Sequence, residues 1–111
     1  MHEYSLACEL KDVVEKFRQG KKLLGVQVEA GSLSGVVPAA FDFSLAAVLE
    51  EGYGKGVKIE TRYVTAEAKC RCGVVFQLKD PLQPCPQCGG WEREVVKGKD
   101  LFIQSIEVEE P

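Results

Sequence analysis

The chain has 111 residues, a formal net charge of −3 and a hydrophobic content of 45%, which suits one small domain of about 100–150 residues. The acidic balance argues against a sequence-independent nucleic-acid binder, which needs a basic surface. No stretch approaches the roughly 20 apolar residues that a membrane helix needs, and the chain does not begin like a signal peptide. We therefore expect a cytoplasmic protein whose cysteines are metal ligands or thiols rather than disulfides.

Two segments have the apolar spacing of helices. Over residues 4–18 the apolar positions recur every three or four residues, which predicts an amphipathic helix. Its apolar stripe consists of Leu6, Leu10, Val13, Val14 and Phe17. Pro38 suits the first position of a second helix, where its missing N–H would have no partner in any case. Gly52, Gly54 and Gly56 are expected to end that helix and open a turn.

Three segments alternate between apolar and polar residues and predict half-buried strands. They cover residues 23–30, 57–64 and 101–108, and the alternation in the last of them shifts near Ser105. Together with the helices they predict an α+β fold, in which two helices pack on a three-stranded sheet.

The segment 67–97 has a different character, because it holds four of the five cysteines, three of the five prolines and the only tryptophan. It has too few apolar residues for a core of its own. We expect a zinc-ribbon-like module here, inserted between the second and third strands. The domain prediction is therefore an α+β domain made of residues 1–66 plus 98–111, and an inserted zinc-binding domain at 67–97.

The four cysteines of this segment, Cys70, Cys72, Cys85 and Cys88, form two close pairs separated by twelve residues. Such spacing is typical of a tetrahedral four-cysteine site for structural Zn(II), in which each pair lies in one tight turn. The glycine after each pair permits positive φ, so that backbone N–H groups can turn toward the sulfurs. Two disulfides, free thiols, or iron in the same thiolate set are the alternatives. The one-residue spacer in the first pair makes Cys70 the least firmly predicted ligand.

His2 is the only histidine of the chain. The amine of Met1, the backbone nitrogen of His2 and its imidazole Nδ1 can close two fused chelate rings around one metal, and the backbone nitrogen of Glu3 could complete a planar set. Nitrogen donors in a tetragonal plane favour Ni(II) or Cu(II) over zinc. The alternative is a solvated terminal histidine without a ligand, since chain ends are commonly disordered.

The combination of these features resembles the HypA/HybF family. The opening residues 1–7 look like the family's Met-His-Glu-x-Ser start, residues 25–36 are similar to its first strand and loop, and residues 106–109 resemble its closing strand. The cysteine pairs stand at the position of the family's zinc module, although many members carry a two-residue spacer where this chain has Cys70-Arg71-Cys72. The match extends over essentially the whole chain.

The resemblance implies a nickel metallochaperone that is not an enzyme. It implies Ni(II) as transient cargo at Met1, His2 and Glu3, and structural Zn(II) at the four cysteines. The implied partners are the nickel-loading GTPase HypB, the large subunit of [NiFe]-hydrogenase and urease accessory proteins, with no nucleic acid and no membrane. The alternative from another class is a zinc-ribbon module that binds protein or nucleic acid without transferring nickel, and a third is an electron carrier with iron in the four-cysteine site.

Overall fold

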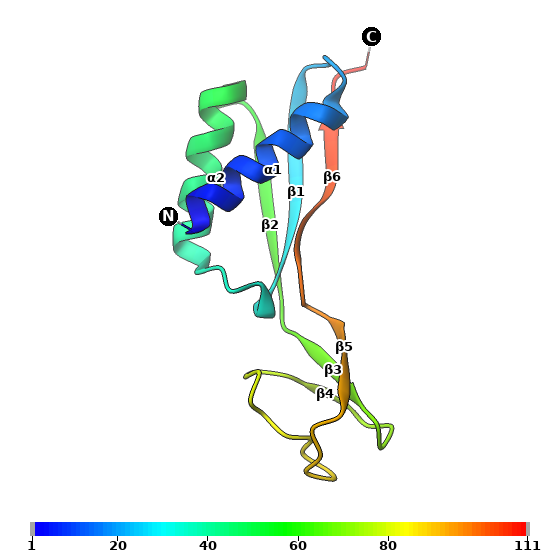
Figure 1. The fold of residues 1–111 in the computed structure, drawn as a ribbon. Helices are drawn as coiled ribbons and strands as arrows, with labels where there is room; N and C mark the ends of the chain where they lie inside the picture. Colours follow the sequence, from blue (N-terminus) through cyan, green and yellow to red (C-terminus); the bar gives the residue numbers. More distant parts are fainter. Residues whose placement is uncertain (1, 111) are drawn as a thin grey trace. The chain divides into compact units, whose positions relative to one another are not determined.

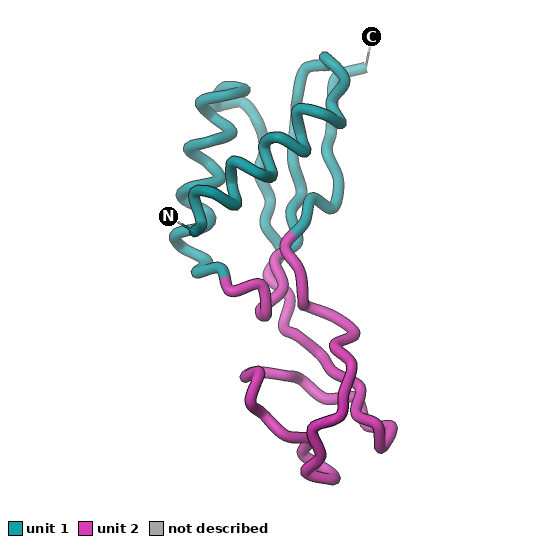
Figure 2. Tube along the Cα trace, in the orientation of Figure 1, with its two compact units in different colours: residues 1–29, 36–62, 102–111 teal, residues 30–35, 63–101 magenta. Residues whose placement is uncertain are grey.

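The computed structural model describes residues 2–110, and the chain divides into two compact units (Figure 2). The first unit holds residues 1–29, 36–62 and 102–111, and the second holds residues 30–35 and 63–101. The second unit thus takes in the predicted insert at 67–97 together with flanking residues on both sides. None of the described helices is long and apolar enough to cross a membrane.

In the first unit, α1 (His2–Arg18) begins two residues before the predicted start. It buries Ala7, Leu10 and Val14, but the outer end of the predicted stripe is exposed, because Phe17 keeps 66% of its surface accessible. This part of the prediction is wrong: the stripe extends past the core and lines an open groove of about 260 Å³, whose other wall includes Ile103 and Ile106.

The second helix, α2 (Pro38–Tyr53), starts at Pro38 as predicted. Gly52 is still helical, and the helix ends at Gly54, whose φ of 90° takes it out of the helical conformation while its N–H bonds the Glu50 carbonyl at 2.8 Å. The residues that α2 buries recur at helical spacing and are Phe41, Ser44, Leu45, Val48 and Leu49. Helices α1 and α2 pack side by side (Figure 1).

A polar clamp joins the C-terminal ends of the two helices. The Tyr53 hydroxyl donates a hydrogen bond of 2.7 Å to the Glu15 carboxylate, which also accepts one of 2.9 Å from the Arg18 guanidinium. The guanidinium lies 5.3 Å from the centre of the Tyr53 ring. Burial, and then the bond to Glu15, raise the pKa of Tyr53 to about 12, so this hydroxyl stays a donor at physiological pH.

The first sheet has the strand order β2-β1-β6, formed by β1 (Leu23–Gly31), β2 (Lys58–Val64) and β6 (Leu101–Val108). Together with α1 and α2 this confirms the predicted two helices and three strands. The register shift in β6 is confirmed too, because half-burial alternates from Leu101 to Ile103 and then restarts at Ile106.

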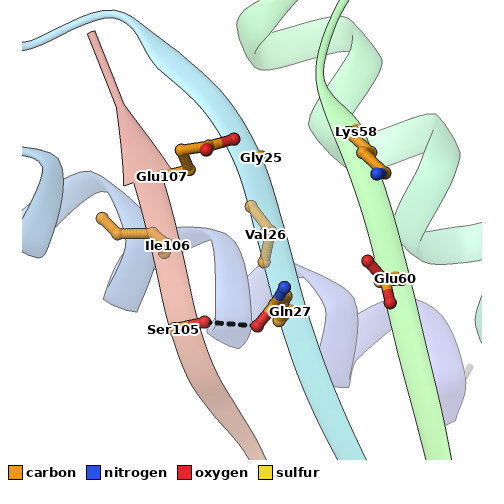
Figure 3. Close-up of a pocket in the computed structure, with 8 residues that line it drawn as sticks. All are labelled: Gly25, Val26, Gln27, Lys58, Glu60, Ser105, Ile106 and Glu107. Carbon is orange, nitrogen blue, oxygen red and sulfur yellow. Dashed lines mark hydrogen bonds between the residues drawn. The ribbon is translucent and has the colours of Figure 1, made fainter.

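One face of this sheet is polar. Figure 3 shows Gln27 of β1, Lys58 and Glu60 of β2, and Ser105 and Glu107 of β6 around a shallow depression. The depression exists because Gly25 has no side chain there, and the Ser105 hydroxyl donates to Gln27 Oε1 at 2.7 Å across it. This is the solvated side that the alternation in the sequence predicts.

The second unit holds a small sheet of order β4-β3-β5, made of β3 (Glu67–Cys70), β4 (Val75–Gln77) and β5 (Arg93–Lys97). Both neighbours run antiparallel to β3. The expectation that this segment lacks a core is wrong, because a small cluster of buried side chains forms one: Ala66, Ala68, Cys70, Phe76, Leu78 and Cys85. Two of its six members are cysteines, so two of the predicted metal ligands are also core residues.

In the second unit, the backbone at Gly98 lies in close contact with the backbone at Gly31 and at Ala66. The Gly31 N–H bonds the Asp100 carbonyl at 2.9 Å, and the Leu33 N–H bonds the Gly98 carbonyl at 3.1 Å. A Cβ on Gly31 would stand 2.2 Å from Gly98, and one on Gly98 would stand 2.6 Å from the Cα of Ala66. The backbones are therefore packed so closely that neither position has room for a side chain.

Candidate metal centre

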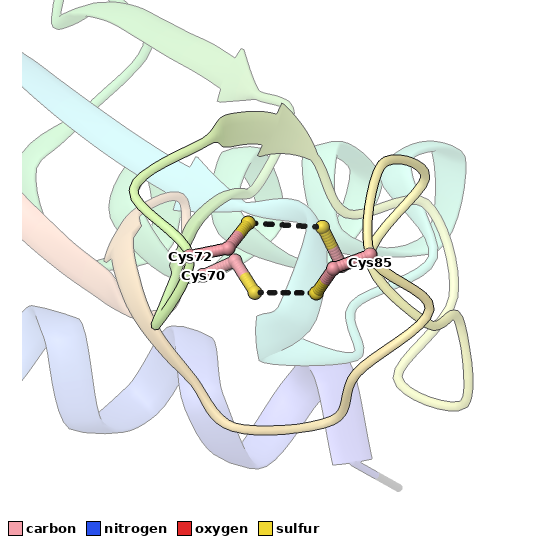
Figure 4. Close-up of side chains that lie close together, drawn as sticks. Cys70, Cys72 and Cys85 are labelled. Carbon is pink, nitrogen blue, oxygen red and sulfur yellow. Dashed lines mark hydrogen bonds between the residues drawn. The ribbon is translucent and has the colours of Figure 1, made fainter.

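The structure brings the four predicted cysteines together (Figure 4). Cys70 Sγ lies 3.5 Å from Cys88 Sγ, Cys72 Sγ lies 3.8 Å from Cys85 Sγ, and all four sulfurs lie within 4.8 Å of one another. These separations exceed the roughly 2.05 Å of a disulfide bond. A tetrahedral zinc ion with Zn–S bonds of about 2.3 Å would hold its sulfurs about 3.8 Å apart. The donor set and its spacing therefore fit zinc.

Two tight turns position the sulfurs. In the first, β3 ends at Cys70, the Gly73 N–H bonds the Cys70 carbonyl at 2.9 Å, and Gly73 has a φ of 98°. In the second, the Gly89 N–H bonds the Cys85 carbonyl at 2.9 Å, and Gly89 has a φ of 73°. Both glycines thus take the left-handed conformation that the sequence predicts after each pair.

Backbone N–H groups point at the sulfurs, which is the usual outer support of a thiolate site. The Gly90 N–H donates to Cys88 Sγ at 3.3 Å. The N–H groups of Cys88 and then Gln87 lower the pKa of Cys85 to about 6. The Cys85 thiol therefore ionises more readily than those of Cys72 and Cys88, whose pKa values are raised.

The thiols of Cys72 and Cys88 hold their protons more tightly. The Val74 N–H lowers the pKa of Cys72, but hydrogen bonds that its protonated thiol makes to the neighbouring sulfurs, together with burial, outweigh it and raise the pKa to about 11. The Gly90 N–H lowers the pKa of Cys88, but the hydrogen bonds with Cys70 and Cys85, together with burial, outweigh it, so this pKa is also raised. A cluster of this kind carries little negative charge by itself, and a dication is what allows all four sulfurs to become thiolates.

The centre has a buried and an exposed side. Cys70 and Cys85 belong to the core of the unit, whereas Cys72 and Cys88 are exposed. Trp91 lies beside them and is 59% exposed, so it does not bury the apolar side of the module. Its ring is paired instead with the Arg93 guanidinium, at 5.6 Å, which also donates to the carbonyls of Pro81 and Gln83.

The predicted nickel ligands lie in the first unit, except that Met1 is outside the described residues. His2 is the first residue of α1 and its side chain is exposed. Glu3 is half-buried, and its carboxylate accepts a hydrogen bond of 3.3 Å from the backbone N–H of Val37. No local sequence pattern signals this contact, because it joins residues 34 positions apart.

The fifth cysteine, Cys8, is half-buried on α1 and forms a hydrogen bond with the hydroxyl of Tyr4. The electrostatic effect of Cys8 and this hydrogen bond raise the pKa of Tyr4, and the charge of Glu51 adds to the effect. Cys8 is thus a packed side chain in a local contact, and it is not a member of the four-cysteine cluster.

Comparison with known proteins identifies the family. The model of the family described as "Hydrogenase/urease nickel incorporation, metallochaperone, hypA" matches residues 1–108. The chain belongs to the HypA family. Hydrogenase maturation factor HypA of Geobacter sulfurreducens is 34% identical over 110 residues, which cover 98% of this chain and all of that protein. The same factor of Dehalococcoides mccartyi is 34% identical over 114 residues, covering 99% and 96% of the two chains.

The HypA fold is found in solved structures as well. The solution structure of the Ni metallochaperone HypA from Helicobacter pylori matches with a TM-score of 0.68 and 21% identity, covering 96% of each chain. A second HypA solution structure matches with a TM-score of 0.58. As a member of the HypA family, the chain is a metallochaperone for hydrogenase maturation with a four-cysteine metal site, and not an enzyme.

Proposed function

We propose that this protein binds Ni(II) reversibly at its N-terminus and delivers it to a maturing [NiFe]-hydrogenase, while Zn(II) holds the four-cysteine unit in shape. Met1, His2 and Glu3 form the nickel-binding end in this proposal, with Met1 and His2 supplying the donor atoms, and Cys70, Cys72, Cys85 and Cys88 form the zinc site. One observation carries the nickel proposal. His2, the only histidine of the chain, is the first residue of α1, and its side chain is exposed.

Helix geometry supports backbone coordination at this end. The first four N–H groups of an α-helix have no acceptor within the helix. Because α1 begins at His2, a nickel ion can take the backbone nitrogen of His2 without breaking a helical hydrogen bond. The imidazole is free to swing onto the same ion, since its side chain is exposed. Nitrogen donors of this kind favour Ni(II).

The sulfur site supports a resident zinc ion rather than cargo. Four thiolates satisfy a tetrahedral ion completely and leave no position for a recipient's ligand. Two of the four cysteines also belong to the small core of their unit, so releasing the metal would cost folding free energy. Cargo and structural metal are thereby assigned to different donors.

The partners in this proposal are the nickel-loading GTPase HypB and the large subunit of [NiFe]-hydrogenase, in the cytoplasm. The family description names both hydrogenase and urease, so urease accessory proteins are included as a second route. Transfer proceeds by ligand exchange, in which donors of the docked partner replace the nitrogens of the chain end one at a time.

Calorimetric titration of tag-free, zinc-loaded protein with Ni(II) tests the proposal. Wild type is expected to bind one nickel ion and His2→Ala to lose that site, while the zinc content of both stays at one per chain. An N-terminal extension that blocks the amine should abolish the site as well. Equal nickel binding by wild type and His2→Ala would refute the nickel site, and purified protein that holds iron at the cysteines would refute the zinc assignment.

A further inference from the structure

The carboxylate of Glu3 lies where the first turns of two helices meet. Glu3 belongs to the first turn of α1, and its Oε2 accepts the N–H of Val37, the residue immediately before α2, at 3.3 Å. Both helices begin in the same region of the first unit (Figure 1). A carboxylate is favourable at a helix N-terminus, where the helix dipole is positive.

Helix α2 needs this carboxylate because its own sequence supplies no cap. The N-cap position is occupied by Val37, whose side chain makes no capping hydrogen bond. In a capping box, a glutamate three residues into the helix bonds the N–H of the N-cap residue. Position three of α2 is Ala40, and Glu3 takes that role from the neighbouring helix.

In the proposed nickel site, the geometry of the chelate rings excludes the backbone nitrogen of Glu3 from the metal plane. The amine of Met1, the imidazole of His2 and the backbone nitrogen of Glu3 are each linked to the backbone nitrogen of His2 by a ring of five or six atoms. Each must therefore lie beside that nitrogen, and a square plane offers only two such positions. With amine and imidazole in the plane, the Glu3 nitrogen cannot join them. The expectation that this nitrogen completes the planar set is therefore wrong, and the position opposite the His2 nitrogen stays open.

We propose that Glu3 is a positioning residue. Its carboxylate fixes the nickel-binding end of α1 on α2 through Val37 and stays there when nickel binds, so that the fourth in-plane position is left to water or to a donor of the recipient. This inference rests on the proposed nickel site for its second half only, since the contact between Glu3 and Val37 is observed directly in the structure.

Amide hydrogen exchange at Val37 tests the contact in full-length, zinc-loaded protein. The N–H of Val37 precedes the first turn of α2, where no helical acceptor is available, so its exchange reports on the Glu3 bond. Loss of a cap worth about 1 kcal/mol should speed exchange about fivefold in Glu3→Ala. Glu3→Gln keeps an oxygen acceptor and should restore most of the protection. Glu9→Ala, the same change at an exposed position of α1, should leave the rate unchanged.

Nickel binding tests the positioning role. We expect Glu3→Ala to keep the nickel absorption spectrum of wild type but to bind nickel several-fold more weakly, with Glu3→Gln close to wild type. Addition of Ni(II) to wild type should leave Val37 exchange unchanged. Acceleration to the rate of Glu3→Ala, or a changed spectrum in Glu3→Gln, would mean that the carboxylate moves to the metal and would overturn the inference. If His2→Ala bound nickel normally, the nickel site would fail while the Val37 result still stood.

Discussion

Gly98→Ala should destabilise the cysteine-bearing unit by about 1–4.5 kcal/mol. Gly98 has a φ of +77°, and an alanine in the left-handed region costs roughly 1–2 kcal/mol. The new Cβ would lie 2.6 Å from the Cα and 2.7 Å from the N of Ala66; because both are backbone atoms, the chain must shift at an overpacking cost of roughly 1–3 kcal/mol. The lower entropy of the unfolded alanine chain offsets about 0.4–1 kcal/mol of this loss.

Gly35→Ala is the matched control. Gly35 belongs to the same unit and has a φ of +82°, but no described atom lies within 4 Å of its Cβ position. It should show only the conformational cost, and we expect a loss of about 0–1.5 kcal/mol. Urea unfolding of zinc-loaded protein, followed by the fluorescence of Trp91, the only tryptophan, measures both variants in the unit concerned. Equal losses in the two variants would refute the close packing of Gly98.

Three further results are expected. Tyr53→Phe removes the hydroxyl that bonds Glu15 but keeps the ring beside Arg18, so thermal unfolding should show a loss of about 1 kcal/mol; an unchanged midpoint would argue against the clamp. Apparent zinc affinity should rise with pH by about tenfold per unit for each proton that binding releases. Thiols such as Cys72, whose pKa is raised to about 11, must lose a proton to bind zinc, whereas the pKa of Cys85 is lowered to about 6. A zinc affinity that does not change between about pH 6 and 8 in a chelator competition would contradict this. Removal of zinc should unfold the second unit but leave the helical circular dichroism signal unchanged, since both long helices lie in the first unit. Loss of the helical signal would refute the idea that the helices fold independently of the second unit.

The helices and long strands were predictable because periodicity reports one buried face. The start of α2 at Pro38 and the shift in β6 near Ser105 both follow from local sequence, and the structure shows both. The cysteine cluster was predictable for a similar reason, since two pairs with following glycines specify two tight turns.

Contacts between distant segments were not predictable. Nothing in the local sequence pairs Glu3 with Val37, or packs Gly31 against Gly98. Strands β3, β4 and β5 have only three to five residues each, which is too short for a period to be recognised. The exposure of Phe17 was missed because its spacing fits the apolar stripe of α1, and spacing does not tell where the core ends.

X-ray absorption at the nickel and zinc edges of protein loaded with one nickel and one zinc ion tests the central claim most directly. We predict a nickel shell of nitrogen and oxygen atoms with outer scattering from one imidazole, and a zinc shell of four sulfurs. Sulfur neighbours around nickel, or a nickel spectrum that does not change in His2→Ala, would contradict it.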